Sequence, residues 1–130
     1  MNSRLPGAFA LLIALAVLPA ANAAPPPATH AEIAYLLRFV EQSGCDFHRN
    51  GSWYDSARAA AHLRDKYALL VARGELATAE EFVEKVATLS SLSGRPYEVR
   101  CNGGAVVATG QWLRDALRRY RESTTAGAAS

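Results

Sequence analysis

CDFHRNG, residues 45–51, is the stretch at which the chain turns from one predicted helix toward the next. Cys45, Phe47 and Arg49 alternate with two polar residues, which is the period of a β-strand. The Asn-Gly pair that closes the stretch is a strong turn signal. We therefore predict a short strand and a turn here, and expect the chain to continue from the turn into a helix and not into a second strand.

Helices are predicted on both sides of this stretch. Thr29 and Glu32 have the spacing of a capping box, so we expect a first helix with Thr29 as its N-cap and Gly44 beyond its end. Apolar residues at positions 33, 36, 37 and 40 recur with helical spacing. Ser52 or Asp55 can cap a second helix that ends before residue 74.

Two more helices are predicted in the second half of the chain. Thr78 and Glu81 form another capping box, and this third helix should end near SSLSG, residues 90–94. Thr109 is the expected cap of a fourth helix, whose apolar stripe runs to Tyr120. Between them, residues 97–101 alternate like a strand, and residues 105–108 can add a brief third one. The sequence thus predicts a helix-rich α+β fold, with about four helices around one core and a two- or three-stranded antiparallel ribbon.

The N-terminus has the features of a secretory signal peptide. Arg4 precedes an apolar run over residues 8–18, and a small-x-small triplet follows at residues 21–23. The run is shorter than the roughly 20 residues that span a bilayer. We therefore expect a signal peptide at 1–23, a Pro-rich leader at 24–28, one globular domain at 29–122 and a disordered tail at 123–130. The expected location is the periplasm or the medium, with no membrane anchor after cleavage.

Cys45 and Cys101 are the two cysteines of the chain. An even count in an exported protein favours a disulfide, which would bring the two predicted strands together. Two free thiols are the alternative. With a reduced Cys45, His48 would have the spacing of a zinc ligand. We predict the bridge and no metal site.

Composition and motifs exclude several functions. The formal net charge is +2, which gives no basis for nucleic-acid binding. The sequence contains no G-x-S-x-G elbow, no S-x-x-K, no H-E-x-x-H and no P-loop. We assign no catalytic residue and no cofactor, and whether the protein is an enzyme stays open, with a non-catalytic role favoured.

One candidate binding surface stands out on the second predicted helix. Arg58, His62 and Lys66 follow one another at intervals of four, so they line one face. Arg49 and Asn50 lie just upstream, and together these donors suit a carboxylate or phosphate. Hydroxyls and backbone amides of the loop after the third helix can join them, and its candidate residues are Ser90, Ser91, Ser93 and Tyr97. A solvated helix edge and ordinary turn residues are the alternative interpretation.

The segments FHRNG, AAAHLRDKY, TAEEFVEKVA and SSLSGRPY together resemble a family of short exported bacterial proteins of unknown function, the YfeK-like proteins. The resemblance spans about Ile33 to Leu117. The family pattern falls on Phe47, Arg49, Asn50, Gly51, His62, Leu63, Lys66, Thr78, Glu80, Phe82, Ser90, Ser91, Gly94, Pro96 and Tyr97. It implies the same compartment and the same candidate surface, and it names no ligand.

Three functional hypotheses follow from the sequence. The leading one is an exported, non-catalytic binding or accessory module for an anionic or cell-envelope-derived partner. The second is a cell-envelope hydrolase with His62 as general base and a serine of the SSLSG loop as nucleophile, which requires those groups to be within about 3.2 Å. The third is a structural interaction protein, for which an exposed apolar patch would be the sign. The oligomeric state is left open.

Overall fold

The computed structural model describes residues 3, 7–16 and 25–128. The predicted cleavage site at residues 21–23 and the last two residues of the predicted tail lie outside these ranges. Residues 7–16 form no helix or strand, and their large apolar side chains, such as Phe9 and Leu12, are exposed. Within the described ranges, no helix is both long enough and apolar enough to cross a membrane.

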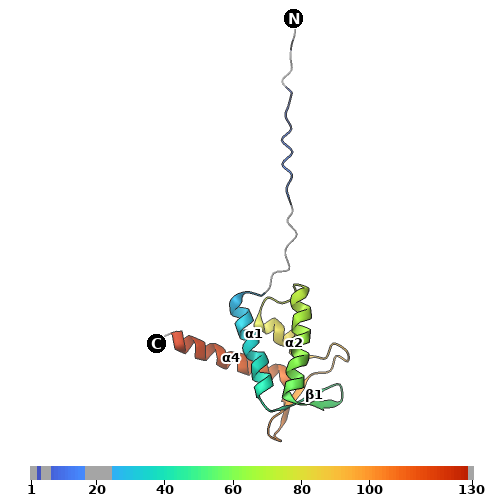
Figure 1. Cartoon of the computed structure of the whole chain (residues 1–130), viewed down its shortest axis with the longest axis vertical. Helices are drawn as coiled ribbons and strands as arrows, with labels where there is room; N and C mark the ends of the chain where they lie inside the picture. The colour runs from blue at the N-terminus through green and yellow to red at the C-terminus, as the bar shows by residue number, and fades with distance from the viewer. Residues whose placement is uncertain (1–2, 4–6, 17–24, 129–130) are drawn as a thin grey trace.

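Residues 27–128 form a helix-rich α+β fold, as predicted (Figure 1). Helices α1 and α2 lie side by side, and α4 packs against α1. The short α3 continues directly into the π-helix η1. In chain order the elements are α1 (Pro27–Gln42), β1 (Asp46–Arg49), β2 (Ser52–Tyr54), α2 (Ser56–Ala72), α3 (Ala79–Phe82), η1 (Val83–Thr88), β3 (Glu98–Arg100), β4 (Val106–Ala108) and α4 (Thr109–Ala128).

The strands form one antiparallel sheet in the order β2-β1-β3-β4, which is larger than the predicted ribbon. The brief third strand is present as β4. The expectation that no strand follows the Asn-Gly turn was wrong, because Ser52–Tyr54 pairs with β1. Asn50 (φ 50°) and Gly51 (φ 84°) are both left-handed. Two such residues in succession are the requirement of a tight type I′ hairpin turn.

The core lies between the inner face of the sheet and the helices. Phe47 of β1 and Val99 of β3 are directly paired, and both are buried. Trp112 of α4 meets the edge of the Phe47 ring at a centroid distance of 5.6 Å. The fully buried apolar side chains come from α1, α2, α3, η1, β3 and α4: Ile33, Leu36, Val40, Ala60, Phe82, Val83, Val86, Ala87, Val99, Leu113 and Ala116.

A Cys45–Cys101 disulfide joins the residue before β1 to the residue after β3, which confirms the predicted bridge. Asp46 pairs with Arg100, so the bridge extends the register of the two strands by one position. The Cα atoms of the two cysteines are 4.4 Å apart. This is the spacing of a non-hydrogen-bonded antiparallel pair. The bridge therefore fixes the two central strands of the sheet to each other.

The predicted start of the first helix was wrong. Helix α1 begins at Pro27, two residues before the predicted domain start, because proline is well suited to the first helical position. The Thr29 hydroxyl does not cap the helix and donates instead to the Ala77 carbonyl (3.2 Å). The third helix ends at Thr88, near residues 90–94 as predicted, and the chain then turns to the extended Leu89.

The fourth helix also differs from its prediction at both ends. Thr109 is the first residue of α4, and its hydroxyl has no hydrogen-bond partner among the described residues. At the other end, residues 123–128 continue the helix instead of forming a disordered tail. The hydroxyls of Ser123 and Thr124 donate to carbonyls one turn back, which satisfies these polar side chains within the helix.

Candidate functional site

The candidate site lies where β1 faces α2. Arg49 alternates with His48 along β1, so it lies on the same face of the sheet as the buried Phe47. Asp55 starts α2 as predicted, because its carboxylate accepts a hydrogen bond from the Arg58 backbone N–H (2.8 Å). Such a bond satisfies one of the free donors at a helix start. This start places His62 on the side of the helix that faces β1.

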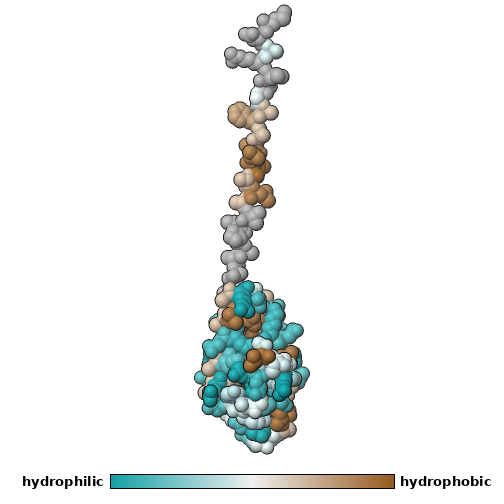
Figure 2. Space-filling view, turned by 90° about the vertical axis from the view of Figure 1, so that its right-hand side faces the viewer, coloured by the Kyte–Doolittle hydropathy of each residue, from teal (hydrophilic) through white to brown (hydrophobic). Residues whose placement is uncertain are grey.

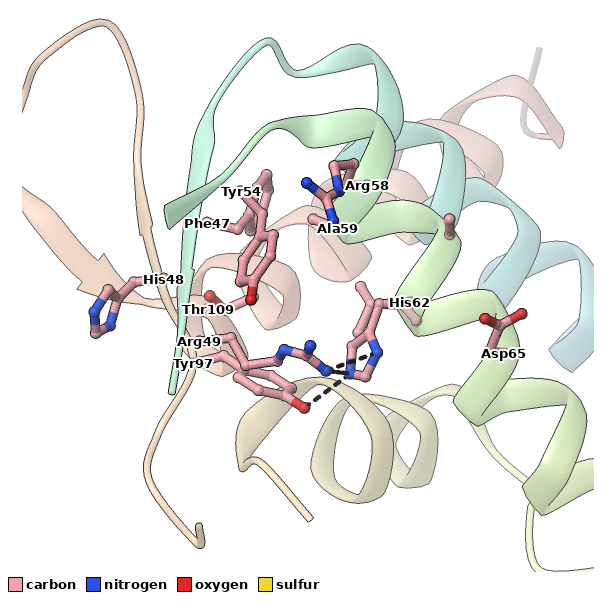
Figure 3. Close-up of a pocket in the computed structure, with 12 residues that line it drawn as sticks. Phe47, His48, Arg49, Tyr54, Arg58, Ala59, His62, Asp65, Tyr97 and Thr109 are labelled. Atoms are coloured by element: carbon pink, nitrogen blue, oxygen red, sulfur yellow. Dashed lines mark hydrogen bonds between the residues drawn. The ribbon is translucent and has the colours of Figure 1, made fainter. Parts of the chain in front are cut away.

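Four side chains meet there, and Figure 3 shows three of them: Arg49, His62 and Tyr97. Nη1 of Arg49 is 2.9 Å from each ring nitrogen of His62. One of these nitrogens can accept its hydrogen bond in the neutral imidazole. Nε2 of His62 is also 3.2 Å from the Tyr97 hydroxyl. Lys66 donates to the Leu89 carbonyl (3.3 Å), and its Nζ is 3.5 Å from the Tyr97 hydroxyl. Residues from β1, α2 and the segment before β3 therefore converge on one point.

Backbone hydrogen bonds hold Tyr97 in this position. Its N–H donates to the carbonyl of Thr88, the last residue of η1 (2.9 Å), and its carbonyl accepts from the N–H of Thr109 (2.9 Å). The residue is 6 % exposed. The π-helix and the start of α4 thus fix the ring against His62, and π-helical turns are often found at functional sites.

Burial and neighbouring charges shift the pKa values of three groups of the cluster, His62, Lys66 and Tyr97. Burial, together with the charges of Arg49 and Lys66, lowers the pKa of His62 below its usual value, although Asp65 opposes this shift. Burial also lowers the pKa of Lys66, with Arg49 adding to the effect, and burial raises the pKa of the Tyr97 phenol. At neutral pH the site therefore presents a neutral imidazole and a neutral phenol beside Arg49 and Lys66.

A cleft of about 280 Å³ opens next to this cluster. Its polar side chains include Arg49, Arg58 and His62, and Asp65 lies farther along α2 (Figure 3). The guanidinium carbons of Arg49 and Arg58 are 5.4 Å and 5.3 Å from the centre of the Tyr54 ring. Both cations therefore stack on one aromatic side chain. The remaining lining residues are Phe47, His48, Ala59, Ala61, Leu63, Tyr97 and Thr109.

The predicted loop residues have different positions relative to the cluster. The Ser93 hydroxyl donates to Oδ1 of Asn50 (2.5 Å), so both help to hold the loop against the hairpin turn. Ser90 is buried, and its hydroxyl accepts hydrogen bonds from the backbone N–H groups of two following loop residues. Ser91 is exposed. The predicted set therefore comes together around Arg49, His62, Lys66 and Tyr97, with Ser91 outside it.

Comparison with known proteins places the chain in a family. The model of a family described as Family of unknown function (DUF5329) matches residues 27–121, most of the chain. The chain belongs to DUF5329. This DUF5329 member is also similar to the uncharacterized protein YfeK of Salmonella typhimurium (strain LT2), with 39 % identity over 64 residues. That match covers 49 % of the chain and 52 % of YfeK, so it spans about half of the relative's length. No solved structure matches the chain.

Tyr54 and Thr109 are cleft residues of this DUF5329 member that were not predicted from the sequence. Tyr54 was not expected on a strand, so its ring could not be placed beside Arg49 and Arg58. Thr109 was expected to cap α4, and the direct passage from β4 into α4 buries it instead. In the sequence, the predicted strand AVVA is followed at once by the predicted last helix. This short spacing could have indicated that the strand continues directly into the helix. Among the described residues, no three His, Cys, Asp or Glu side chains are grouped as metal ligands.

Proposed function

We propose that this protein is an exported, non-catalytic binding module whose cleft holds the anionic group of a ligand. The observation that carries the proposal is the state of two cations: Arg49, which lines the cleft, and Lys66, which lies beside it next to Tyr97. Arg49 and Lys66 are half-buried, and neither is within ion-pair distance of a carboxylate in the part of the chain that the structure describes. Withdrawing a cation from water without a negative charge beside it is unfavourable, and a bound anion would relieve that cost.

The other half-buried cations of the described ranges are arranged differently. Arg64 of α2 pairs with Glu41 of α1, and Arg100 of β3 pairs with Asp46 of β1. Among the half-buried cations that the structure describes, the two without an ion pair are therefore the two in the cluster beside the cleft. Arginine and lysine side by side provide directional donors together with a point charge, which suits a carboxylate or a phosphate.

The test is a thermal-shift screen of the full chain with carboxylates, phosphorylated compounds and cell-wall fragments. A ligand at 100 times its dissociation constant stabilises the folded state by about 2.7 kcal/mol, which raises the melting midpoint measurably. Arg49→Gln and Lys66→Gln should each weaken the response at least tenfold in ligand concentration. Arg64→Gln is the matched control, because it removes a charge from the same helix outside the cleft. Absence of any shift, or equal shifts in wild type and Arg49→Gln, would contradict the proposal.

The hydrolase hypothesis has less geometric support. The hydrogen-bond partners of His62 are Arg49 and Tyr97, and within the described ranges no serine hydroxyl bonds to it. Ser90 is engaged by the loop backbone. The interaction-protein hypothesis predicts a large apolar patch, and the face in Figure 2 is mainly hydrophilic with small separate apolar areas over the folded part.

The proposed location is the periplasm or the medium. It is supported by the apolar N-terminal run and by the disulfide, which is typical of oxidising compartments. N-terminal sequencing of the protein recovered from a periplasmic fraction should find Ala24 as the first residue. Recovery of the protein only from the cytoplasm, with residues 1–23 still attached, would contradict export.

A further inference from the structure

The cleft contains a buried hydroxyl that the proposed anion contact does not use. Thr109 is 1 % exposed, and its Oγ1 has no hydrogen-bond partner in the described part of the chain. The residue cannot easily turn away, because its N–H is bonded to the Tyr97 carbonyl and Gly110 packs against Thr88. A buried hydroxyl without a hydrogen-bond partner is unfavourable, so this atom is a site for a polar group from a ligand.

Apolar and aromatic side chains form much of the wall of the same cleft. They include Phe47, Tyr54, Ala59 and Leu63. Alanine at position 59 leaves space that a larger residue would fill. The cleft volume is about 280 Å³. This is nearly twice the volume of an engineered cavity that holds benzene, which is roughly 150 Å³. A ring with substituents fits this space, whereas a bare inorganic anion would contact only the cations.

The free donors of the two cations suit the oxygens of a carboxylate. Arg49 is already engaged with His62, and Lys66 with Tyr97 and a carbonyl, so each has part of its donor capacity free. Asp65 adds a negative charge near the same helix face. The two oxygens of one carboxylate can accept from both cations.

We propose that the ligand is a small amphiphilic monoanion: a carboxylate on a ring-sized apolar body that also carries a hydroxyl for Thr109. This inference rests on the proposed anion-binding function and adds the body and the second polar group of the ligand. The carboxylate lies at Arg49 and Lys66, the ring lies against Phe47 and Tyr54, and the hydroxyl exchanges a hydrogen bond with Thr109.

Isothermal titration of the full chain with matched probes tests this inference. The probes are benzoate, the three hydroxybenzoate isomers, acetate, inorganic phosphate and benzamide. We expect benzoate to bind at least tenfold more tightly than acetate or phosphate, because only the ring uses the apolar wall. One hydroxybenzoate isomer should bind about tenfold more tightly than benzoate. Benzamide, which lacks the charge, should bind at least tenfold more weakly than benzoate.

Two variants separate the contributions. Thr109→Val keeps the shape of the side chain and should reduce the preference for the best hydroxybenzoate to within twofold of benzoate. Ala59→Leu should weaken benzoate more than acetate because it fills the cleft. Ala57→Leu, at an exposed position of the same helix, is the control and should bind like wild type. Ala59→Leu keeps the test decisive even where Thr109→Val fails to fold.

The outcomes distinguish this inference from the proposed function. Phosphate or acetate binding as tightly as benzoate would overturn the amphiphilic ligand and leave anion binding intact. An unchanged hydroxybenzoate preference in Thr109→Val would overturn the role of the hydroxyl. Benzamide binding as tightly as benzoate would instead overturn the requirement for an anion. No binding of any probe would overturn both proposals.

Discussion

At the scale of single residues, His62 links the site to pH. Burial and two nearby cations lower the pKa of His62 in the folded chain below the usual 6.5. As the pH falls through 6.5, the imidazole of His62 therefore binds more protons in the unfolded chain than in the folded chain. The free energy of unfolding decreases as the pH falls, until the pH is below the pKa of His62 in the folded chain. His62 thus contributes most favourably above pH 6.5.

The corresponding prediction concerns His62→Gln. Urea unfolding at pH 8, 6.5 and 5 should show that the variant loses less stability than wild type as the pH falls, because glutamine does not titrate. The comparison uses the slope of the unfolding free energy against pH and not its absolute value, since the substitution also changes contacts with Arg49 and Tyr97. Parallel plots of the unfolding free energy against pH for the two proteins would contradict the lowered pKa of His62.

At the scale of secondary-structure elements, the β1–β2 hairpin depends on Gly51. A Cβ at this position would have no neighbour within 4 Å, but the backbone is left-handed (φ 84°). Gly51→Ala should therefore cost about 1–2 kcal/mol through backbone strain alone, measured as the free energy of unfolding in urea. Gly127→Ala is the matched control, because it also meets no atom within 4 Å and lies in helix α4. Equal stabilities of the two variants would contradict this explanation.

The elements also show what sequence reasoning could find. Caps and glycine stops were identified at Asp55, Gly44 and Gly74, because these signals act within a few residues of the chain. The strand Ser52–Tyr54 was missed because three residues are too few to show a period. Pro27 and Thr29 are competing start signals two residues apart, and only tertiary packing, through the contact of Thr29 with Ala77, decides between them.

The candidate site was predictable to a similar extent. The line of Arg58, His62 and Lys66 follows from helical spacing alone. The approach of Arg49 and Tyr97 depends on which strands pair and on how η1 ends, and the local sequence does not specify either. Thr109 could not be recognised as a cleft residue, because a threonine before a helix is ordinarily its cap.

At the scale of the whole molecule, Arg121 connects three helices. Its guanidinium pairs with Glu32 of α1 in a two-bond contact and with Glu80 of α3. Arg121→Gln should destabilise the fold by about 1 kcal/mol in urea. The hydrogen bond from Arg121 lowers the pKa of Glu80, so this stabilisation is present above the usual pKa of the carboxyl and is lost as the pH falls below it. The loss caused by Arg121→Gln should therefore shrink in acid.

Arg118→Gln is the matched control for that prediction. Arg118 lies on the same helix and its side chain is 64 % exposed, with pairs only to Asp115 and Glu122 of α4 itself among the described residues. Its substitution should change the free energy of unfolding by less than about 0.5 kcal/mol. If both variants lost a similar amount of unfolding free energy, the ion pairs between helices would not be the source of the destabilisation in Arg121→Gln.

The disulfide is the other constraint on the whole fold. Its two cysteines have a sequence separation of 56 residues. For a loop of that length the chain-entropy model gives about 4 kcal/mol. Replacing both cysteines, Cys45→Ala with Cys101→Ala, should lower the free energy of unfolding by roughly that amount in urea. Reductant should shift the unfolding midpoint of wild type and leave the double variant unchanged. An equal response of both proteins to reductant would contradict a stabilising bridge.

The position of this bridge also ties the cleft to the redox state of its surroundings. Arg49 is the last residue of β1, one of the two strands that the bridge joins. Tyr97 comes directly before β3, the other strand. Because ordering these strands orders both residues, we expect binding of the proposed ligand and formation of the sulfur–sulfur bond to be thermodynamically coupled. By reciprocity, oxidation would then strengthen binding of the proposed ligand by the same factor by which the bound ligand makes the cysteines harder to reduce.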